Sequence, residues 1–206
     1  MTSPTTITPA ESGMALIAYD DGLATASTTA AEAMLAPDTW QRWESGGSTN
    51  VTLSMGTARS ADYIVVAGHN LGTAGATITI ETRAVIGSGV YTSRLASYEP
   101  ATNAPFIVSF TEATVGDVKI TVDVDCEIAR VMCGSILEME RPLYSEHMPS
   151  LLNPDIEYRN TISESGQFLS RNVIRRGAKT PFAWKHLTAA WVRSTFAPFV
   201  EHAITL

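Results

Sequence analysis

Residues 51–82 read VTLSMGTARSADYIVVAGHNLGTAGATITIET, and this stretch contains the clearest strand signals of the chain. From Val51 to Met55 apolar and polar side chains alternate, as in a strand with one buried face, and Gly56 is expected to end that strand. Residues 63–67 form a continuous apolar run that suits a central strand, and residues 76–82 alternate again. The stretch therefore predicts three strands, the last two joined by a glycine-rich loop.

Outward from this stretch, short strand signals recur every eight to twelve residues, which is typical of a sandwich or barrel. The further strands are predicted at residues 14–19, 106–110, 118–124 and 128–132. No helical pattern of ten to fifteen residues separates them, so a parallel βαβ architecture is disfavoured. We predict a mainly β protein with an antiparallel β-sandwich over residues 14–140 and one short helix at residues 29–35, which Pro37 stops.

The ends of the chain differ from this central part. Residues 1–13, rich in Thr, Ser and Pro, are predicted to be an N-terminal arm, and residues 141–155 a linker. Residues 156–206 are predicted to be a C-terminal extension of a β-hairpin plus a helix. Its strands are expected at 156–162, 167–174 and 179–184, with turns at Ser165-Gly166 and Arg176-Gly177, and its helix at 187–200, ended or kinked by Pro198.

Composition and charge exclude several classes of protein. The 206 residues are 45% hydrophobic and 17% charged, which is ordinary for a globular protein and unlike a disordered one. No apolar run approaches the ~20 residues that cross a bilayer, and the N-terminus has no export signal, so we expect a soluble protein without a membrane span. The net charge of −7 speaks against non-specific nucleic-acid binding.

The charge is unevenly distributed along the chain. Residues 1–150 carry seven basic and seventeen acidic side chains, whereas residues 151–206 carry seven basic and four acidic ones. The basic extension is therefore complementary to the acidic body, either within one molecule or between neighbouring copies. The sequence leaves both alternatives open.

The sequence offers little catalytic chemistry. The four histidines do not form a metal-binding spacing, and the common hydrolase, nucleotide and dinucleotide motifs are absent, so we predict no enzyme, no cofactor and no bound metal. Cys126 and Cys133 are expected to be free buried thiols. The carboxylates of Asp117, Asp123, Asp125 and Glu127 are expected on a solvated outer face, and a Ca²⁺ site at Asp20 and Asp21 has only weak support.

The order of motifs from residue 19 to residue 82 resembles a known fold. DDG at 20–22 is followed by DTWQRWES at 38–45 and then by the strands of residues 51–81. This order resembles the discoidin-like, galactose-binding-like β-sandwich, a jelly roll. YIVVAGHNLGTAG at 63–75 and the segment at 165–204 look more specifically like tail-tip or baseplate proteins of tailed bacteriophages; together, residues 19–82 and 165–204 cover about half of the chain.

The resemblance implies a structural virion protein. Such a protein would form a ring, a trimer or hexamer, that joins the tail tube to the tip or the receptor-binding apparatus. Its partners would be the tube, hub and receptor-binding proteins, and it would be assembled in the bacterial host cytoplasm and located in the virion tail. The alternative is a glycan-binding module on the virion surface that aids host attachment.

Two groups of residues carry these hypotheses. Trp40 and Trp43 either cap the end of the sandwich core or form an aromatic platform for a sugar. His69 and Asn70 either build a hydrogen-bonded turn before Gly72, a residue that tolerates positive φ, or contact a ligand or partner. The predicted subunit interface consists of Arg171, Arg175, Arg176, Trp191, Phe196 and Phe199. The three arginines alternatively form a solvated hairpin face.

Overall fold

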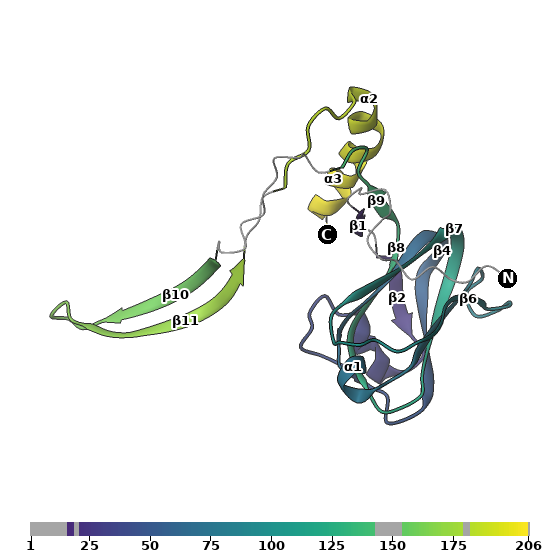
Figure 1. The fold of residues 1–206 in the computed structure, drawn as a ribbon, viewed down its shortest axis with the longest axis horizontal. Helices are drawn as coiled ribbons and strands as arrows, with labels where there is room; N and C mark the ends of the chain where they lie inside the picture. The colour runs from purple at the N-terminus through teal and green to yellow at the C-terminus, as the bar shows by residue number, and fades with distance from the viewer. Residues whose placement is uncertain (1–15, 19–20, 143–153, 179–181, 206) are drawn as a thin grey trace.

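The structure is a computed structural model that describes residues 16–18, 21–142, 154–178 and 182–205. The mainly antiparallel β-sandwich predicted from the sequence is confirmed, with a C-terminal hairpin and helix (Figure 1). The predicted N-terminal arm at 1–13 and most of the predicted linker at 141–155 lie outside the described residues.

Two long strands build both layers of the sandwich. They are β4 (Thr49–His69) and β7 (Phe106–Val122), which pair with each other on both sides of register shifts between Ser54 and Arg59 and between Ala61 and Tyr63. Strands that change layer at such irregularities form the corners of a sandwich. The strands predicted at 51–55 and 63–67 are thus halves of β4, and Gly56 does not end the first half. Those predicted at 106–110 and 118–124 are halves of β7.

The remaining strands extend each layer. The first layer runs β2 (Leu23–Ala26), the first half of β4, the second half of β7, β5 (Ile78–Arg83) and β6 (Thr92–Tyr98). The second layer runs β3 (Trp43–Glu44), β8 (Glu127–Gly134), the second half of β4 and the first half of β7. Beside them, β1 (Leu16–Ala18) pairs with β9 (Ile136–Glu138).

The hydrophobic core lies between the two layers. The apolar members of the alternating strands are completely or almost completely buried there, among them Val51, Leu53, Ile78, Ile80, Val118, Ile120, Ile64, Val66, Ile128 and Val131. Cys126 and Cys133 are buried free cysteines, as predicted. Burial raises the pKa of the Cys133 thiol to about 12.

The loop predicted at residues 69–75 contains a single helical turn, α1 (Leu71–Ala74), which ends at Gly75 with a φ of 63°. Gly72 was expected to supply the positive φ, but its role is different. A Cβ atom at Gly72 would lie 2.5 Å from the carbonyl carbon of Thr102. Glycine is required there because two backbone segments approach closely.

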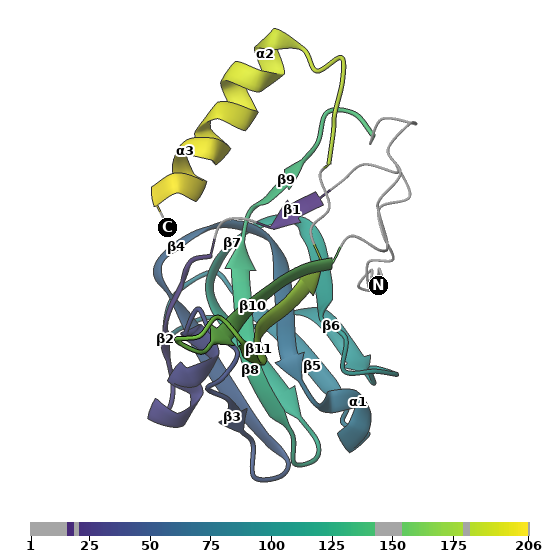
Figure 2. The ribbon, with the colours of Figure 1, turned by 90° about the vertical axis from the view of Figure 1, so that its left-hand side faces the viewer.

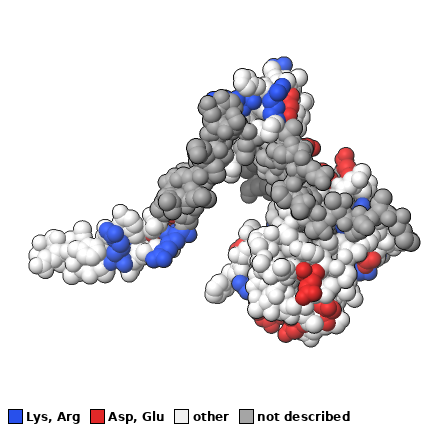
Figure 3. Space-filling model, in the orientation of Figure 1, with Lys and Arg blue, Asp and Glu red and all other residues white. Residues whose placement is uncertain are grey.

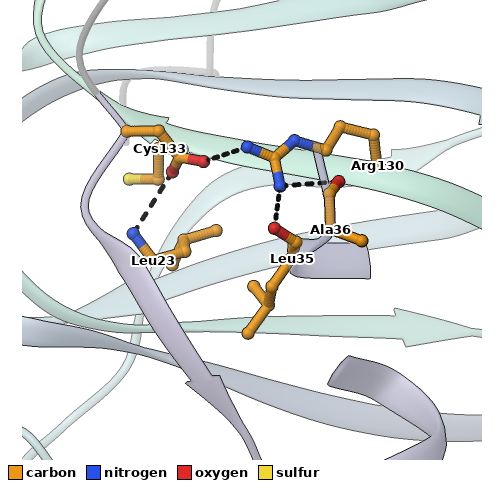
Figure 4. A network of polar contacts seen from close by, with 6 residues as sticks. Leu23, Leu35, Ala36, Arg130 and Cys133 are labelled. Atoms are coloured by element: carbon orange, nitrogen blue, oxygen red, sulfur yellow. Dashed lines mark hydrogen bonds and ion pairs between the residues drawn. The ribbon is translucent and has the colours of Figure 1, made fainter. Parts of the chain in front are cut away.

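The short helix predicted at residues 29–35 is present as the 3-10 helix η1 (Thr29–Leu35). Its C-terminal end is held against β8 by Arg130, whose guanidinium donates hydrogen bonds to the carbonyls of Leu35 and Ala36 (Figure 4). The same guanidinium forms an ion pair with Asp21 at 2.7 Å. Asp21 also accepts the backbone N–H groups of Leu23 and Cys133, so this carboxylate is occupied by structural contacts.

Asp117 departs from the predicted outer face, because its side chain is completely buried. Its carboxylate accepts hydrogen bonds from Arg83 at 2.5 Å and from the backbone N–H of Gly87 at 2.8 Å. Burial alone would raise the pKa of Asp117, but hydrogen bonds from Ser54, Gly87 and Arg83 hold it below its usual value. The other three predicted outer carboxylates are exposed or half-buried.

The C-terminal hairpin consists of β10 (Pro154–Ile162) and β11 (Phe168–Ala178), which we call the ribbon. Figure 1 shows that it stands apart from the sandwich. The predicted turn at Ser165-Gly166 is present, whereas Arg176 and Gly177 continue β11. Of the third strand predicted at 179–184, residues 182–184 are irregular, and residues 179–181 lie outside the described part.

The C-terminal helix predicted at 187–200 comprises α2 (Ala189–Trp191), the π-helical turn η2 (Val192–Phe196) and α3 (Ala197–Thr205). Thr188 caps it, and the carboxylate of Glu140 accepts both the backbone N–H and the hydroxyl of Thr188 at 2.7 Å. Pro198 does not end the helix, because the wider π turn before it accommodates the proline ring. Figure 2 shows the helix beyond the end of the sandwich that carries β1 and β9.

Candidate functional site

The most exposed aromatic side chain of the sandwich lies in the segment between η1 and β3. Trp40 is 89% exposed, although its backbone is fixed. The carboxylate of Asp38 accepts the N–H groups of Trp40 and Gln41 at 2.9 and 3.1 Å. Two residues further on, Arg42 forms an ion pair with Glu127 at 2.7 Å. The exposed indole ring therefore belongs to a segment whose backbone is held by Asp38 and whose following residue Arg42 is held by Glu127.

A small hollow opens at the same end of the sandwich. It has a volume of about 170 Å³ and is lined by Glu44, Asn70, Asp125, Cys126 and Glu127. Asn70 is fixed by the N–H of Glu127, which its side-chain oxygen accepts at 2.8 Å, and Asp125 accepts the N–H of Gly46 at 2.9 Å. The hollow is smaller than the ~300 Å³ of the smallest usual ligand pockets, so it suits a surface-bound group rather than an enclosed one.

This end of the molecule is acidic. Five carboxylates lie on its loops and strand ends, and Arg42 is the basic side chain beside them; the five are Asp38, Glu44, Asp123, Asp125 and Glu127. A hydrogen bond from the Thr77 backbone N–H lowers the pKa of Asp123, which keeps that carboxylate charged. In Figure 3, Asp and Glu side chains gather on the lower part of the sandwich. The arrangement offers an aromatic stacking surface and hydrogen-bond acceptors under a negative potential.

Two of the four predicted contact residues are not available to a ligand. Trp43 is 5% exposed because its pairing with Ile128 places it in the core, so it caps the sandwich. His69 is buried at the end of β4, where its Nε2 donates to the carbonyl of Ala104 at 3.0 Å and its ring meets Phe106 edge-on. Burial lowers the pKa of His69. Trp40 and Asn70 remain as candidate contacts.

The six predicted interface residues lie on the two C-terminal elements. Arg171 stacks over Tyr158 at 4.4 Å, Arg175 forms an ion pair with Asp155 at 2.7 Å, and Arg176 is exposed. Trp191, Phe196 and Phe199 stack in sequence along the helix, with ring centroids 5.9 and 5.6 Å apart, and are partly exposed. The structure thus gathers the arginines on the ribbon and the aromatic residues on the helix.

Arg42, Glu44 and Asp125 belong to this site although the sequence interpretation did not select them as contacts. Arg42 and Glu44 flank Trp43 within DTWQRWES, so charged neighbours of the tryptophan pair were the available signal. No sequence signal pointed to Asp125 as a contact residue, because only the pairing of β3 with β8 brings it to the hollow.

The described residues contain neither a candidate membrane-spanning helix nor a candidate metal site. No helix in this part of the chain is long and apolar enough to cross a membrane. The described His, Cys, Asp and Glu side chains form no group of three or more that could hold a metal ion.

Comparisons with known proteins gave similar structures but no family. No protein-family model matches the sequence, and no curated protein matches it. A pectin-binding carbohydrate-binding module has a TM-score of 0.46 at 15% identity, over 55% of this chain and 91% of the module. Truncated AlyQ, with CBM32 and alginate lyase domains, has a TM-score of 0.46 at 21% identity, over 70% of this chain and 40% of that one. Chitosan-binding module 1 from a chitosanase/glucanase of Paenibacillus sp. IK-5 has a TM-score of 0.43 at 13% identity, over 54% of this chain and 94% of the module.

Proposed function

We propose that the sandwich is a non-catalytic glycan-binding module whose contact surface is Trp40 together with the hollow at the same end of the sandwich. The observation that carries this proposal is the 89% exposure of Trp40 on a segment held by hydrogen bonds and an ion pair. A large aromatic ring fixed in solvent is a stacking surface for the apolar face of a sugar ring. Asn70 and the carboxylates of the hollow supply fixed acceptors for sugar hydroxyl groups.

The charge of the site selects the class of glycan. With Glu44, Asp125 and Glu127 around the hollow, a polyuronate would bring like charges together. A neutral sugar meets no such repulsion, and a protonated amino sugar is attracted. We therefore propose neutral or amino-sugar oligomers as the ligand class.

Isothermal titration calorimetry with chitosan oligomers, neutral cello-oligosaccharides and polygalacturonate tests this proposal. Trp40→Ala should remove saturable binding without changing the melting temperature. Val90→Ala is the matched control, because Val90 is also 89% exposed and lies at the opposite end of the sandwich. Unchanged binding by Trp40→Ala, preference for polygalacturonate, or no binding to any of the three compounds would overturn the proposal.

We propose a structural role in a phage tail as the second function. It rests on the sequence resemblance, and the exposed apolar side chains of the ribbon favour it because such surface is normally covered in an assembly. Negative-stain electron microscopy of the full chain at high concentration tests it. Closed rings of one size support the tail-ring role, whereas isolated particles or open filaments contradict it.

A further inference from the structure

Most apolar side chains of the ribbon lie on one face, which we call the apolar face, and the other face is polar. Residues directly opposite each other in an antiparallel pair lie on the same face. The pairs Tyr158 with Val173 and Ile162 with Phe168 therefore share a face with Ile156. The same register places Asn160, Arg171 and Arg176 on this face. The other face carries Asp155, Glu157, Arg159, Thr161, Ser170, Asn172 and Arg175. Five apolar side chains on one face and none on the other is a distribution typical of strands that bury one side.

In the described part of the chain nothing buries that apolar face. Ile162 and Phe168 are 62% and 61% exposed, and Ile156, Tyr158 and Val173 are 43–50% exposed. Leu169 and Ile174, which lie at the two register shifts, are each 61% exposed. A two-stranded hairpin is at best marginally stable alone in water and needs a further strand or layer on its apolar face.

We propose that the ribbon packs, apolar face against apolar face, on the ribbon of a second copy of this chain, with the two ribbons antiparallel. The inference goes beyond glycan binding and does not depend on it. A two-fold axis makes this contact self-complementary, so the same side chains serve both copies.

The distribution of charge along the ribbon supports the antiparallel arrangement. Arg176 lies near the base of the ribbon and Glu164 in the turn at its tip; both are exposed, and neither forms an ion pair with another described residue. Antiparallel packing brings the tip of each copy to the base of the other. Arg176 of each copy then lies near Glu164 of its partner, and this pair forms twice across the axis.

The net charge of the ribbon and the size of its apolar surface agree with a second ribbon as the binding partner. The ribbon has four basic and three acidic side chains, so two ribbons repel each other little, whereas the described sandwich, residues 21–142, has seven basic and fourteen acidic ones. The seven exposed apolar side chains offer on the order of 700 Å², near the ~800 Å² that each partner contributes to a standard interface. Tyr158 lies in the middle of the apolar face, and the guanidinium of Arg171 stacks on its ring.

Sedimentation equilibrium of the full chain measures whether the contact forms. We expect a dimer whose dissociation constant rises at least tenfold in Phe168→Ser, while Asn172→Ser, a substitution on the polar face, leaves it unchanged. A monomer throughout, or a dimer insensitive to Phe168→Ser, would overturn the proposal. Circular dichroism melting should show an intact sandwich in both variants, since neither residue contributes to the sandwich core.

A charge exchange and disulfide cross-linking test the antiparallel arrangement. Glu164→Arg and Arg176→Glu should each weaken the dimer, and the double exchange should restore it. For disulfide cross-linking, Ile156→Cys and Ile162→Cys should each fail to link with itself and should link when mixed; the native Cys126 and Cys133 are buried and do not interfere. Self-linking of Ile162→Cys, or no rescue by the double exchange, would overturn the antiparallel packing while leaving the glycan measurement unaffected.

Discussion

Replacing the buried carboxylate of Asp117 should strongly destabilise the sandwich. Asp117→Asn keeps the size of the side chain but removes the charge that faces Arg83, whose side chain is 16% exposed. Removing one partner of a buried ion pair lowers the free energy of unfolding by about 3–5 kcal/mol. Because Arg83 keeps some solvent contact and lies 4.8 Å from the centre of the Tyr91 ring, we expect the lower end, about 3 kcal/mol.

Urea denaturation of Asp117→Asn measures this loss directly. In a thermal melt, 3 kcal/mol corresponds to a decrease of roughly 6–12 °C for a chain of this size. The control is Glu99→Gln, which neutralises an exposed carboxylate and should change stability by less than about 0.5 kcal/mol. A loss below about 1 kcal/mol for Asp117→Asn would refute the argument from the buried pair.

The contribution of Asp117 to folding stability should also depend on pH. The pKa of Asp117 is lower in the folded protein than in the unfolded chain, so its contribution is present above the unfolded pKa of about 3.9 and is lost as pH falls through the folded value. Asp117→Asn should therefore lose part of the acid sensitivity of the native protein. If the variant lost stability at low pH as steeply as the native protein does, the lowered pKa of Asp117 would be contradicted.

Three other substitutions or treatments have definite expected outcomes. His69→Gln should lessen the loss of stability as pH falls below about 6.5, because burial lowers the pKa of His69 and the unfolded chain takes up the proton first. Melting curves from pH 7.5 to 5 would show this difference, and an identical pH dependence of the melting temperature in both proteins would contradict it. Gly72→Ala should cost about 1–3 kcal/mol in urea denaturation, since the new Cβ would lie 2.5 Å from the Thr102 carbonyl carbon, and a neutral result would mean that the two backbone segments separate easily. Cys133, with its pKa raised to about 12, should not react with a thiol reagent at pH 8 until the protein is unfolded, and rapid labelling of the native protein at this residue would disprove its burial.

The strands with regular alternation could be predicted from the sequence because period-two patterning records which side chains face the core. It could not show that residues 51–55 and 63–67 are one strand, since a change of layer leaves the apolar pattern of each half intact. The edge strands β2 and β6 were missed because LATA and TSRLASY have small or polar side chains with little contrast between faces.

The candidate site was only partly predictable for a similar reason. Trp40 and Trp43 are three residues apart, and spacing alone cannot tell which is buried; the pairing of Trp43 with Ile128 decides it. Asp117 lies at a position of β7 that alternation assigns to solvent. It is buried because the segment after β5 folds over this part of β7, where a Cβ at Gly116 would lie 2.7 Å from the Ile86 nitrogen.

The most direct test of glycan binding follows the indole N–H signals of the four tryptophans by NMR during titration with a chitosan oligomer. The proposal predicts a saturable shift of the Trp40 signal, while the signal of the buried Trp43 stays fixed. Saturable binding that leaves the Trp40 signal unchanged would contradict the claim that this exposed ring is the contact surface.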